Sequence, residues 1–114
     1  MVTTDNKPDQ HKELCLGLND TYRKKNQDYG DSFSEARHAI PSYTLGKLYD
    51  KFSRFKHLME VNAQQAVPDE TVEDTLLDMA NYCVMEVLER RRDAQKENTS
   101  NAVQQSSVRF RADN

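Results

Sequence analysis

Residues 69–88 read DETVEDTLLDMANYCVMEVL and carry the strongest helical signal of the chain. At about 100° per residue, the apolar side chains of this stretch fall on one broad face. That face consists of Val72, Leu76, Met79, Ala80, Cys83, Val84, Val87 and Leu88. Asp74, Asp78 and Asn81 line its edge, and Glu73 projects into the apolar arc itself. A buried carboxylate is costly unless a cation or hydrogen-bond donors meet it, so we expect a positive group opposite Glu73.

Two earlier segments have the same helical period. The first covers about residues 10–29, where Gly30 ends it, and the second covers about residues 43–61. Their expected buried residues are Leu14, Cys15, Leu18, Tyr22 and Tyr29 in the first segment, and Leu45, Leu48, Tyr49, Phe52, Phe55 and Met59 in the second. Lys25 falls inside the apolar face of the first segment, and Lys51 projects among the apolar residues of the second.

A short helical turn is expected between these two segments. Ser32, followed three residues later by Glu35, is a capping-box signal, and Pro41 closes the turn after Ala39. The sequence therefore predicts an all-α fold, which is a small bundle of three main helices plus this short helical turn.

The helical domain is expected to span residues 10–97. A flexible arm precedes it at residues 1–9, and a polar tail, disordered or docked on a partner, follows it at residues 98–114. We expect the third helix to end near the arginines at 90–92, because cations suit the C-terminal end of a helix dipole.

The chain is marginal as a lone domain. A helical core of this size buries only about 60% of its unfolded surface, and the apolar arc within residues 69–88 is wider than one neighbouring helix covers. We therefore expect a homo-oligomer to complete the bundle. Cys15 and Cys83 lie on apolar helix faces, so they are expected to be buried free thiols.

Charge and hydropathy exclude several kinds of partner. The net charge is −3 and 31% of the residues are charged, so nothing attracts the whole chain to nucleic acid or to anionic membranes. We expect no sequence-specific nucleic-acid partner. No apolar run approaches the roughly 20 residues that span a bilayer, and no signal peptide begins the sequence. The expected location is the cytoplasm, without a membrane partner.

Each main helix carries ionisable residues on its expected buried side: Lys25 in the first, Lys51 in the second, and Glu73, Asp74 and Asp78 in the third. Such residues are uncommon in cores, and when several recur in one small bundle they usually meet. We therefore expect one polar cluster. The simpler interpretations are a Thr71–Asp74 capping box, an exposed Asp78, turn chemistry at Asp28, and lysines that keep their ammonium groups in water.

A cluster of carboxylates beside lysines and an arginine suits a nucleotide. Carboxylates four residues apart can hold Mg²⁺, which takes a few protein oxygens together with phosphate oxygens. Lysine and arginine neutralise a polyphosphate. The sequence contains no Gly-rich phosphate loop, nucleophile elbow or Cys–His pairing, so covalent catalysis is not supported.

Three ordered blocks of the sequence resemble a known family. They are KKNQDYGDSF at residues 24–33, LYDKFSR at residues 48–54 and DETVEDTLLDMANY at residues 69–82. Together they resemble the nucleotide modification associated domain family, which is common in bacteriophages and is similar to the MazG-like all-α nucleotide pyrophosphohydrolases. The resemblance covers about residues 12–90.

The resemblance implies a Mg²⁺ site built from acidic pairs on two successive helices. Here the third helix is acidic, but the second offers only Asp50 and Glu60, with Lys51 and Arg54 beside Asp50. Fewer acids and more bases favour the holding of a phosphate over the assembly of a multi-metal centre.

Two functional hypotheses follow. The first is a MazG-like, Mg²⁺-dependent nucleoside triphosphate pyrophosphohydrolase of phage nucleotide metabolism, acting in the host cytosol. The alternative is a non-catalytic phage protein of anti-defence function. It needs no cofactor and sequesters a nucleotide signal, such as a cyclic oligonucleotide or an adenine-nucleotide derivative. A structural adaptor without a small ligand is the third interpretation.

Candidate residues are assigned by charge and shape. For the hydrolase, the expected catalytic residues are Asp50, Glu73 and Asp78, and the expected Mg²⁺ ligands are Glu73, Asp74 and Asp78. For both hypotheses, the expected ligand-binding residues are Lys25, Asp28, Tyr29, Phe33, Lys51, Arg54 and Asn81. Cations contact phosphates, the Asn81 amide contacts a sugar or base edge, and aromatic rings stack on a base.

Overall fold

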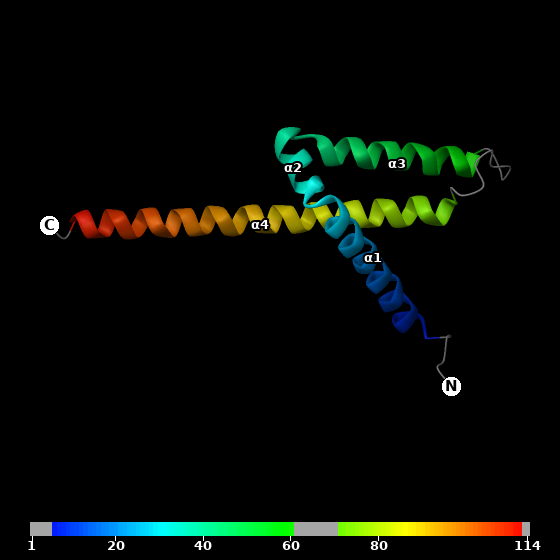
Figure 1. Cartoon of the computed structure of the whole chain (residues 1–114), viewed down its shortest axis with the longest axis horizontal. Helices are drawn as coiled ribbons and strands as arrows, with labels where there is room; N and C mark the ends of the chain where they lie inside the picture. Colours follow the sequence, from blue (N-terminus) through cyan, green and yellow to red (C-terminus); the bar gives the residue numbers. More distant parts are fainter. Residues whose placement is uncertain (1–5, 61–70, 113–114) are drawn as a thin grey trace. The chain divides into compact units, whose positions relative to one another are not determined.

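The computed structural model describes residues 6–60 and 71–112, and these residues form four α-helices without a strand. The helices are α1 (Lys7–Tyr29), α2 (Ser32–Ala39), α3 (Tyr43–Glu60) and α4 (Val72–Ala112) (Figure 1). The all-α prediction is confirmed. The connection between α3 and α4 and the first five residues of the expected N-terminal arm lie outside the described residues. Within the described part of the chain, no helix is long and apolar enough to cross a membrane.

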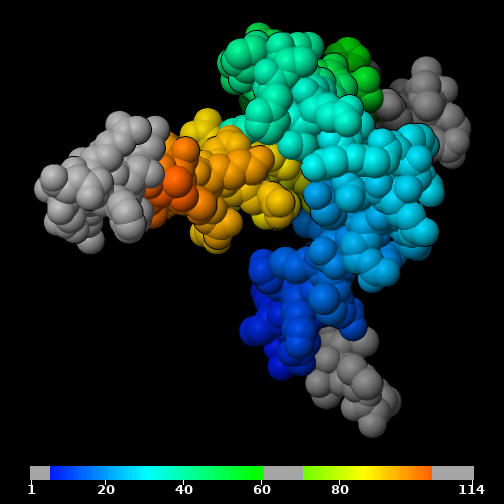
Figure 2. Space-filling view, turned by 60° about the vertical axis from the view of Figure 1, so that its left-hand side comes forward, coloured from blue at the N-terminus to red at the C-terminus, as the bar shows by residue number. Residues whose placement is uncertain are grey.

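The chain divides into two compact units, Met1–Tyr82 and Cys83–Asn114, and the boundary falls within α4. In the first unit, α3 and the start of α4 lie side by side and run in opposite directions (Figure 1). α2 packs on α3, and the space-filling view shows α2 and the first turns of α3 as adjoining surfaces (Figure 2). The second unit consists of the remainder of α4.

The ends of α1 follow from its proline and glycine. The helix begins at Lys7, three residues earlier than predicted, with Pro8 in its first turn. Proline suits this place because the first backbone N–H groups of a helix have no intrahelical partner. The helix ends before Gly30, as predicted, and Gly30 has a positive φ of 66°. Glycine adopts this conformation without the steric cost that a Cβ atom brings.

The capping predictions had opposite outcomes in α2 and α4. Asp31 precedes α2 and makes no side-chain cap, so the Ser32 capping box is wrong, although the helix ends at Ala39 as expected. At the start of α4, the Asp74 backbone N–H donates to Thr71 Oγ1 at 3.0 Å, and the Thr71 N–H points to Asp74 Oδ2 at 3.5 Å. This reciprocal arrangement is the predicted capping box.

The predicted end of the third helix near residues 90–92 is wrong, because α4 continues to Ala112. No glycine or proline follows Pro68 in the sequence, so no residue type forces the helix to stop. Residues 98–112 are therefore helical, in contrast to the irregular tail that was expected. Docking of this segment on a partner stays a prediction.

The predicted apolar face of α4 is covered only in part: in the first unit Val72, Met79 and Ala80 are half-buried, and Leu76 is exposed. Within the first unit, Thr75 is buried and Asp78 and Tyr82 are half-buried, whereas Glu73 and Leu76 are exposed. In the second unit, the apolar residues Cys83, Val84, Val87 and Leu88 are also exposed. Because Glu73 faces solvent, it needs no buried cation, and the expectation of one is wrong.

Only part of the apolar arc of α3 is covered. Leu48 and Phe55 are half-buried, whereas Leu45, Tyr49, Phe52 and Met59 are exposed, contrary to the single buried face that was predicted. Cys15 is exposed as well, so the prediction of buried thiols is wrong for the single chain. Among the residues whose side chains the structure describes, no apolar one is fully buried.

Candidate functional site

An ion pair joins α3 to α4 at the centre of the first unit. Lys51 Nζ lies 3.1 Å from Asp78 Oδ2. The two side chains differ in their access to water, since Lys51 is 16% exposed and Asp78 is 45% exposed. The lysine stem is therefore covered by protein, while one side of the carboxylate remains open to solvent or to a ligand.

Three aromatic rings, one from each of α2, α3 and α4, form a cluster. The Phe33 ring centroid lies 5.9 Å from that of Tyr43, at an edge-on angle of 63°, and 6.1 Å from that of Tyr82. Lys47 Nζ lies 5.4 Å from the centroid of the Tyr43 ring, which is within the range of a cation–π contact. Aromatic pairs of this geometry contribute beyond the area that they bury.

The Lys51–Asp78 ion pair and the aromatic cluster are neighbours along α3 and α4. Lys47 and Lys51 are one turn apart on α3, and Asp78 and Tyr82 are one turn apart on α4. Because the two helices run in opposite directions, a step back along α3 corresponds to a step forward along α4. We define the candidate site as Phe33, Tyr43, Lys47, Lys51, Asp78 and Tyr82. It combines two cations, one carboxylate and three aromatic rings.

Asn81 ties α4 to α1 at the border of this site. Its side-chain Nδ2 donates to the backbone oxygen of Leu18 at 3.2 Å. This bond uses one of the two N–H groups of the amide, and the amide oxygen keeps its acceptor capacity. Asn81 therefore positions α1, and its predicted contact with a sugar or base stays a prediction.

The predicted ligand-binding residues of α1 are exposed near its C-terminal end. Lys25, Asp28 and Tyr29 occupy the last turns of α1, and all three are exposed. None of the described contacts joins them to Lys51 or Asp78. The inner face of α1 is instead formed by Leu18 and Tyr22, which are half-buried.

Asp50 and Arg54 pair with each other on the surface of α3. Their side chains lie one helical turn apart, and Arg54 Nη2 is 3.5 Å from Asp50 Oδ2. Each is about half exposed. Surface pairs of this kind contribute little to stability, so both groups remain chemically accessible.

The predicted Mg²⁺ ligands are spread over the start of α4. Glu73 and Asp74 are exposed in its first turn, Asp74 takes part in the Thr71 capping box, and Asp78 pairs with Lys51. Within residues 6–60 and 71–112, no three His, Cys, Asp or Glu side chains gather closely enough to hold a metal ion. The described carboxylates of a single chain do not fit a Mg²⁺ centre, so a metal role for them stays a prediction.

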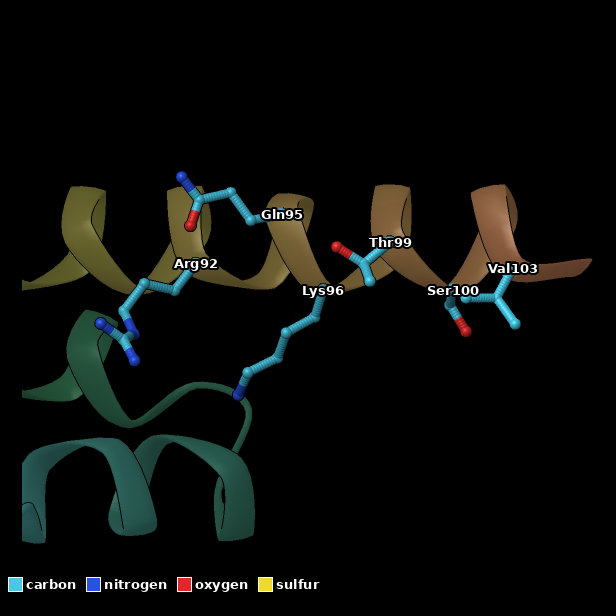
Figure 3. Close-up of a pocket in the computed structure, with 6 residues that line it drawn as sticks. All are labelled: Arg92, Gln95, Lys96, Thr99, Ser100 and Val103. Carbon is cyan, nitrogen blue, oxygen red and sulfur yellow. The ribbon is translucent and has the colours of Figure 1, made fainter.

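An open groove of about 500 Å³ lies on α4 within the second unit. Its lining residues are Arg92, Gln95, Lys96, Thr99, Ser100 and Val103. Figure 3 shows the long side chains of Arg92 and Lys96 extending to the same side of the helix. Because one helix supplies all of the lining, this groove does not surround a ligand, and we do not place the site there.

Sequence reasoning identified Lys51 and Asp78 but missed three members of the candidate site. Lys47, Tyr43 and Tyr82 were not assigned a role. Their spacing carried a signal, because Tyr43, Lys47 and Lys51 follow one another at intervals of four residues, as do Asp78 and Tyr82.

Comparison with known proteins adds one finding. The family model described as nucleotide modification associated domain 1 matches residues 25–90, which is more than half of the chain. The matched range contains the whole candidate site, from Phe33 to Tyr82. No curated protein and no solved structure matches the chain.

Proposed function

Because this chain belongs to the nucleotide modification associated domain 1 family, we propose that it binds a nucleotide at the candidate site. Lys51 and Lys47 contact the phosphates, and Asp78 contacts hydroxyl or amino groups of the sugar or base. The protein acts as a homo-oligomer. The observation that carries the proposal is the Lys51–Asp78 ion pair, which is covered on its lysine side and open on its carboxylate side.

The chemistry of the pair supports a phosphate-bearing ligand. An ammonium group has three donors, and Asp78 lies 3.1 Å from the Lys51 ammonium, so the proposal assigns the other donors of that group to phosphate oxygens. Lys47, one turn away, adds a second positive charge that now rests on the Tyr43 ring. A cation held on an aromatic face by about 0.5–1 kcal/mol is released at low cost when a phosphate offers a stronger partner.

Self-association is supported by the apolar face of α4. Leu76 in the first unit and Val84, Val87 and Leu88 in the second are exposed in the single chain. Burial of such side chains stabilises a protein by about 1.5–3 kcal/mol each, so leaving them in water is unfavourable. An oligomer removes this cost.

Binding without turnover is the form of the function that the residues favour. The carboxylate best placed in the site is neutralised by Lys51, and the described carboxylates gather no metal centre. In a phage, a protein of this kind sequesters a nucleotide signal, for example a cyclic oligonucleotide or an adenine-nucleotide derivative, and so removes it from a host defence system.

The second candidate is a MazG-like, Mg²⁺-dependent hydrolase that converts a nucleoside triphosphate and water to the monophosphate and pyrophosphate. It is favoured by the exposure of Asp50 on α3 and of Glu73 and Asp74 on α4, which leaves these carboxylates accessible. Mg²⁺ would polarise the phosphoryl group and activate the attacking water. The described part of one chain does not assemble such a site, so this candidate needs carboxylates from elsewhere.

The two candidates differ in what becomes of the nucleotide. We would incubate purified protein with linear and cyclic nucleotides, with and without Mg²⁺, and then identify free and heat-released compounds by mass spectrometry. Binding predicts recovery of one intact nucleotide from the protein, independent of Mg²⁺. Hydrolysis predicts monophosphate and pyrophosphate that form only with Mg²⁺. The absence of both would refute the proposed function.

Two substitutions locate the activity. Lys51→Met removes the charge while keeping the stem, and we expect it to weaken nucleotide binding at least tenfold in calorimetry. Asp78→Asn keeps an acceptor for Lys51 and removes the negative charge, so it preserves binding but abolishes hydrolysis. Lys24→Met is the matched control, because Lys24 pairs with Asp20 at 3.0 Å on the exposed surface of α1. Unchanged affinity in Lys51→Met would remove Lys51 from the site.

A further inference from the structure

Thr44 has a buried hydroxyl group without a hydrogen-bond partner. It lies in the first turn of α3, where it is only 6% exposed. Among the described residues, none forms a hydrogen bond with Thr44 Oγ1. Buried polar groups in folded proteins nearly always have a partner, and a buried group that lacks one costs stability. The hydroxyl of Thr44 therefore requires an explanation that the fold of the chain does not supply.

A second buried threonine shows that the chain can satisfy such a group locally. Thr75, at the start of α4, is also 6% exposed, but its Oγ1 donates to the Thr71 backbone oxygen at 3.2 Å. That oxygen lies four residues earlier in the sequence. Thr44 is only the second residue of α3, so the carbonyl four residues before it, that of Ile40, lies outside the helix. The Ile40 oxygen instead accepts the Tyr43 backbone N–H at 2.9 Å.

Thr44 lies on the same side of α3 as the two cations of the candidate site. At about 100° and 1.5 Å per residue, Lys51 is about 20° around the helix from Thr44 and about 10 Å further along it. Lys47 is about 60° around the helix and about 4.5 Å further along. Its ammonium group reaches back toward the start of the helix, where it lies 5.4 Å from the centroid of the Tyr43 ring. One hydroxyl and two ammonium groups therefore follow one stripe of α3.

The first turn of α3 is also the positive end of a helix dipole. The first backbone N–H groups of an α-helix lack partners within the helix, so this end attracts anions. The first turn of α3 holds no acidic residue that would offset the positive charge, and the Lys47 ammonium adds to it. A cation beside this end of a dipole is unfavourable by itself, and an anion bound between them removes the repulsion. The start of α3 is therefore matched to an anion with several acceptor oxygens.

We propose that Thr44 donates a hydrogen bond from its hydroxyl to a phosphate oxygen of the bound nucleotide, and that Lys47 and the first turn of α3 hold the same phosphate group. This inference rests on the proposed function and deepens it, because it places a phosphate at the start of α3. The hydroxyl is buried in the free chain, so a ligand reaches it only when a neighbouring side chain moves. Lys47 makes that movement when it leaves the Tyr43 ring and pairs with the phosphate.

The test uses inorganic pyrophosphate as the probe, because pyrophosphate presents phosphate oxygens without a sugar or a base. Its affinity for the full chain is measured by calorimetry without Mg²⁺, and wild type is expected to bind it. Thr44→Val replaces the hydroxyl with a methyl group of similar size and should weaken binding at least fivefold. Thr75→Val is the matched control, since it removes an equally buried hydroxyl that already has a partner. The affinity of Thr75→Val should equal that of wild type.

A second pair of variants tests the role of Lys47. Lys47→Met removes the ammonium group and keeps the length of the side chain, so it should weaken pyrophosphate binding at least fivefold. Lys56→Met is the control on the same helix, because Lys56 is exposed and lies about 120° around α3 from Thr44. Equal affinities in these two variants would remove Lys47 from the phosphate contact.

The stability of the free chain gives a readout that a merely structural role of Thr44 would reverse. Thr44→Val removes an unpaired buried hydroxyl, so it should raise the midpoint of thermal unfolding by about 4 °C. Thr75→Val removes a hydrogen-bonded hydroxyl, so it should lower the midpoint. Weaker binding together with a more stable free chain does not arise from a damaged fold. It is expected only of a group that is kept for a ligand.

The outcomes separate this inference from the proposed function. A wild type that binds no pyrophosphate at millimolar concentration would overturn the inference, as would an unchanged affinity in Thr44→Val. A lower unfolding midpoint in Thr44→Val would show that the hydroxyl supports the fold, which also overturns it. In these cases the nucleotide recovered or hydrolysed in the mass-spectrometric experiment still decides the proposed function. Pyrophosphate binding without any such nucleotide would refute that function, and with it the statement that the phosphate belongs to a nucleotide.

Discussion

Removing Asp78 from the Lys51–Asp78 ion pair should lower the stability of the protein more than removing Lys51. Asp78→Ala leaves the Lys51 ammonium without its carboxylate in a place where the side chain is only 16% exposed. Lys51→Met leaves a carboxylate that is 45% exposed and can be hydrated. Asp78→Ala therefore leaves a largely buried charge without a partner, whereas Lys51→Met does not.

The burial of each partner sets the expected magnitudes. Breaking a fully buried pair costs about 3–5 kcal/mol, and an exposed pair is worth about 0.2–1 kcal/mol. For this partly covered pair we expect Asp78→Ala to lower the free energy of unfolding by about 2 kcal/mol. Lys51→Met should lower it by less than about 1 kcal/mol, since methionine fills the same space without a charge. The double variant should give a coupling energy of about 1.5 kcal/mol.

Urea unfolding followed by far-UV circular dichroism measures the free energy of unfolding of the wild type, the two single variants and the double variant. The protein concentration must be held constant, because association changes apparent stability. The Lys24–Asp20 pair on α1 is the control, and its exposure predicts a coupling of about 0.3–0.5 kcal/mol. A Lys51–Asp78 coupling no larger than that of the control would refute the reasoning, as would a greater loss from Lys51→Met than from Asp78→Ala.

Three further predictions concern local structure. Gly30→Ala should lower the free energy of unfolding by about 1 kcal/mol because its φ is 66°, whereas Gly17→Ala in the middle of α1 should raise it by a similar amount; equal signs in urea unfolding would contradict this. Thr71→Val should cost about 1 kcal/mol in the same assay by removing the Oγ1 acceptor of the α4 cap, and no change would make that cap irrelevant. Asn81→Leu removes the hydrogen bond to the Leu18 carbonyl, so it should accelerate hydrogen exchange in α1 severalfold relative to α3. An equal change in both helices would show that this hydrogen bond does not hold α1 in place.

The helices were predictable wherever a local signal set them. Periodicity located α1, α3 and the start of α4, Gly30 ended α1, and Thr71 with Asp74 capped α4. The C-terminal end of α4 was not predictable from composition alone. A polar sequence without glycine or proline is compatible both with an irregular tail and with a continued helix, and charge at residues 90–92 suits a helix interior as well as its end.

The covered side of α4 was predicted only in part, for a different reason. Periodicity tells which residues share a face, but it does not tell what covers that face. On α3, Lys51 pairs with Asp78 on the polar side of α4, and Lys47 lies over the Tyr43 ring. Of the predicted apolar face, Val72, Met79 and Ala80 are half-buried in the first unit, whereas Leu76 is exposed.

The same argument explains which site residues were found. Lys51 was placed among the apolar residues of its helix and Asp78 at the edge of an apolar face, and they do meet. Lys25 and Glu73 were placed in the middle of apolar faces on the assumption that those faces point inward. Both are exposed, so their projected positions gave the wrong environment.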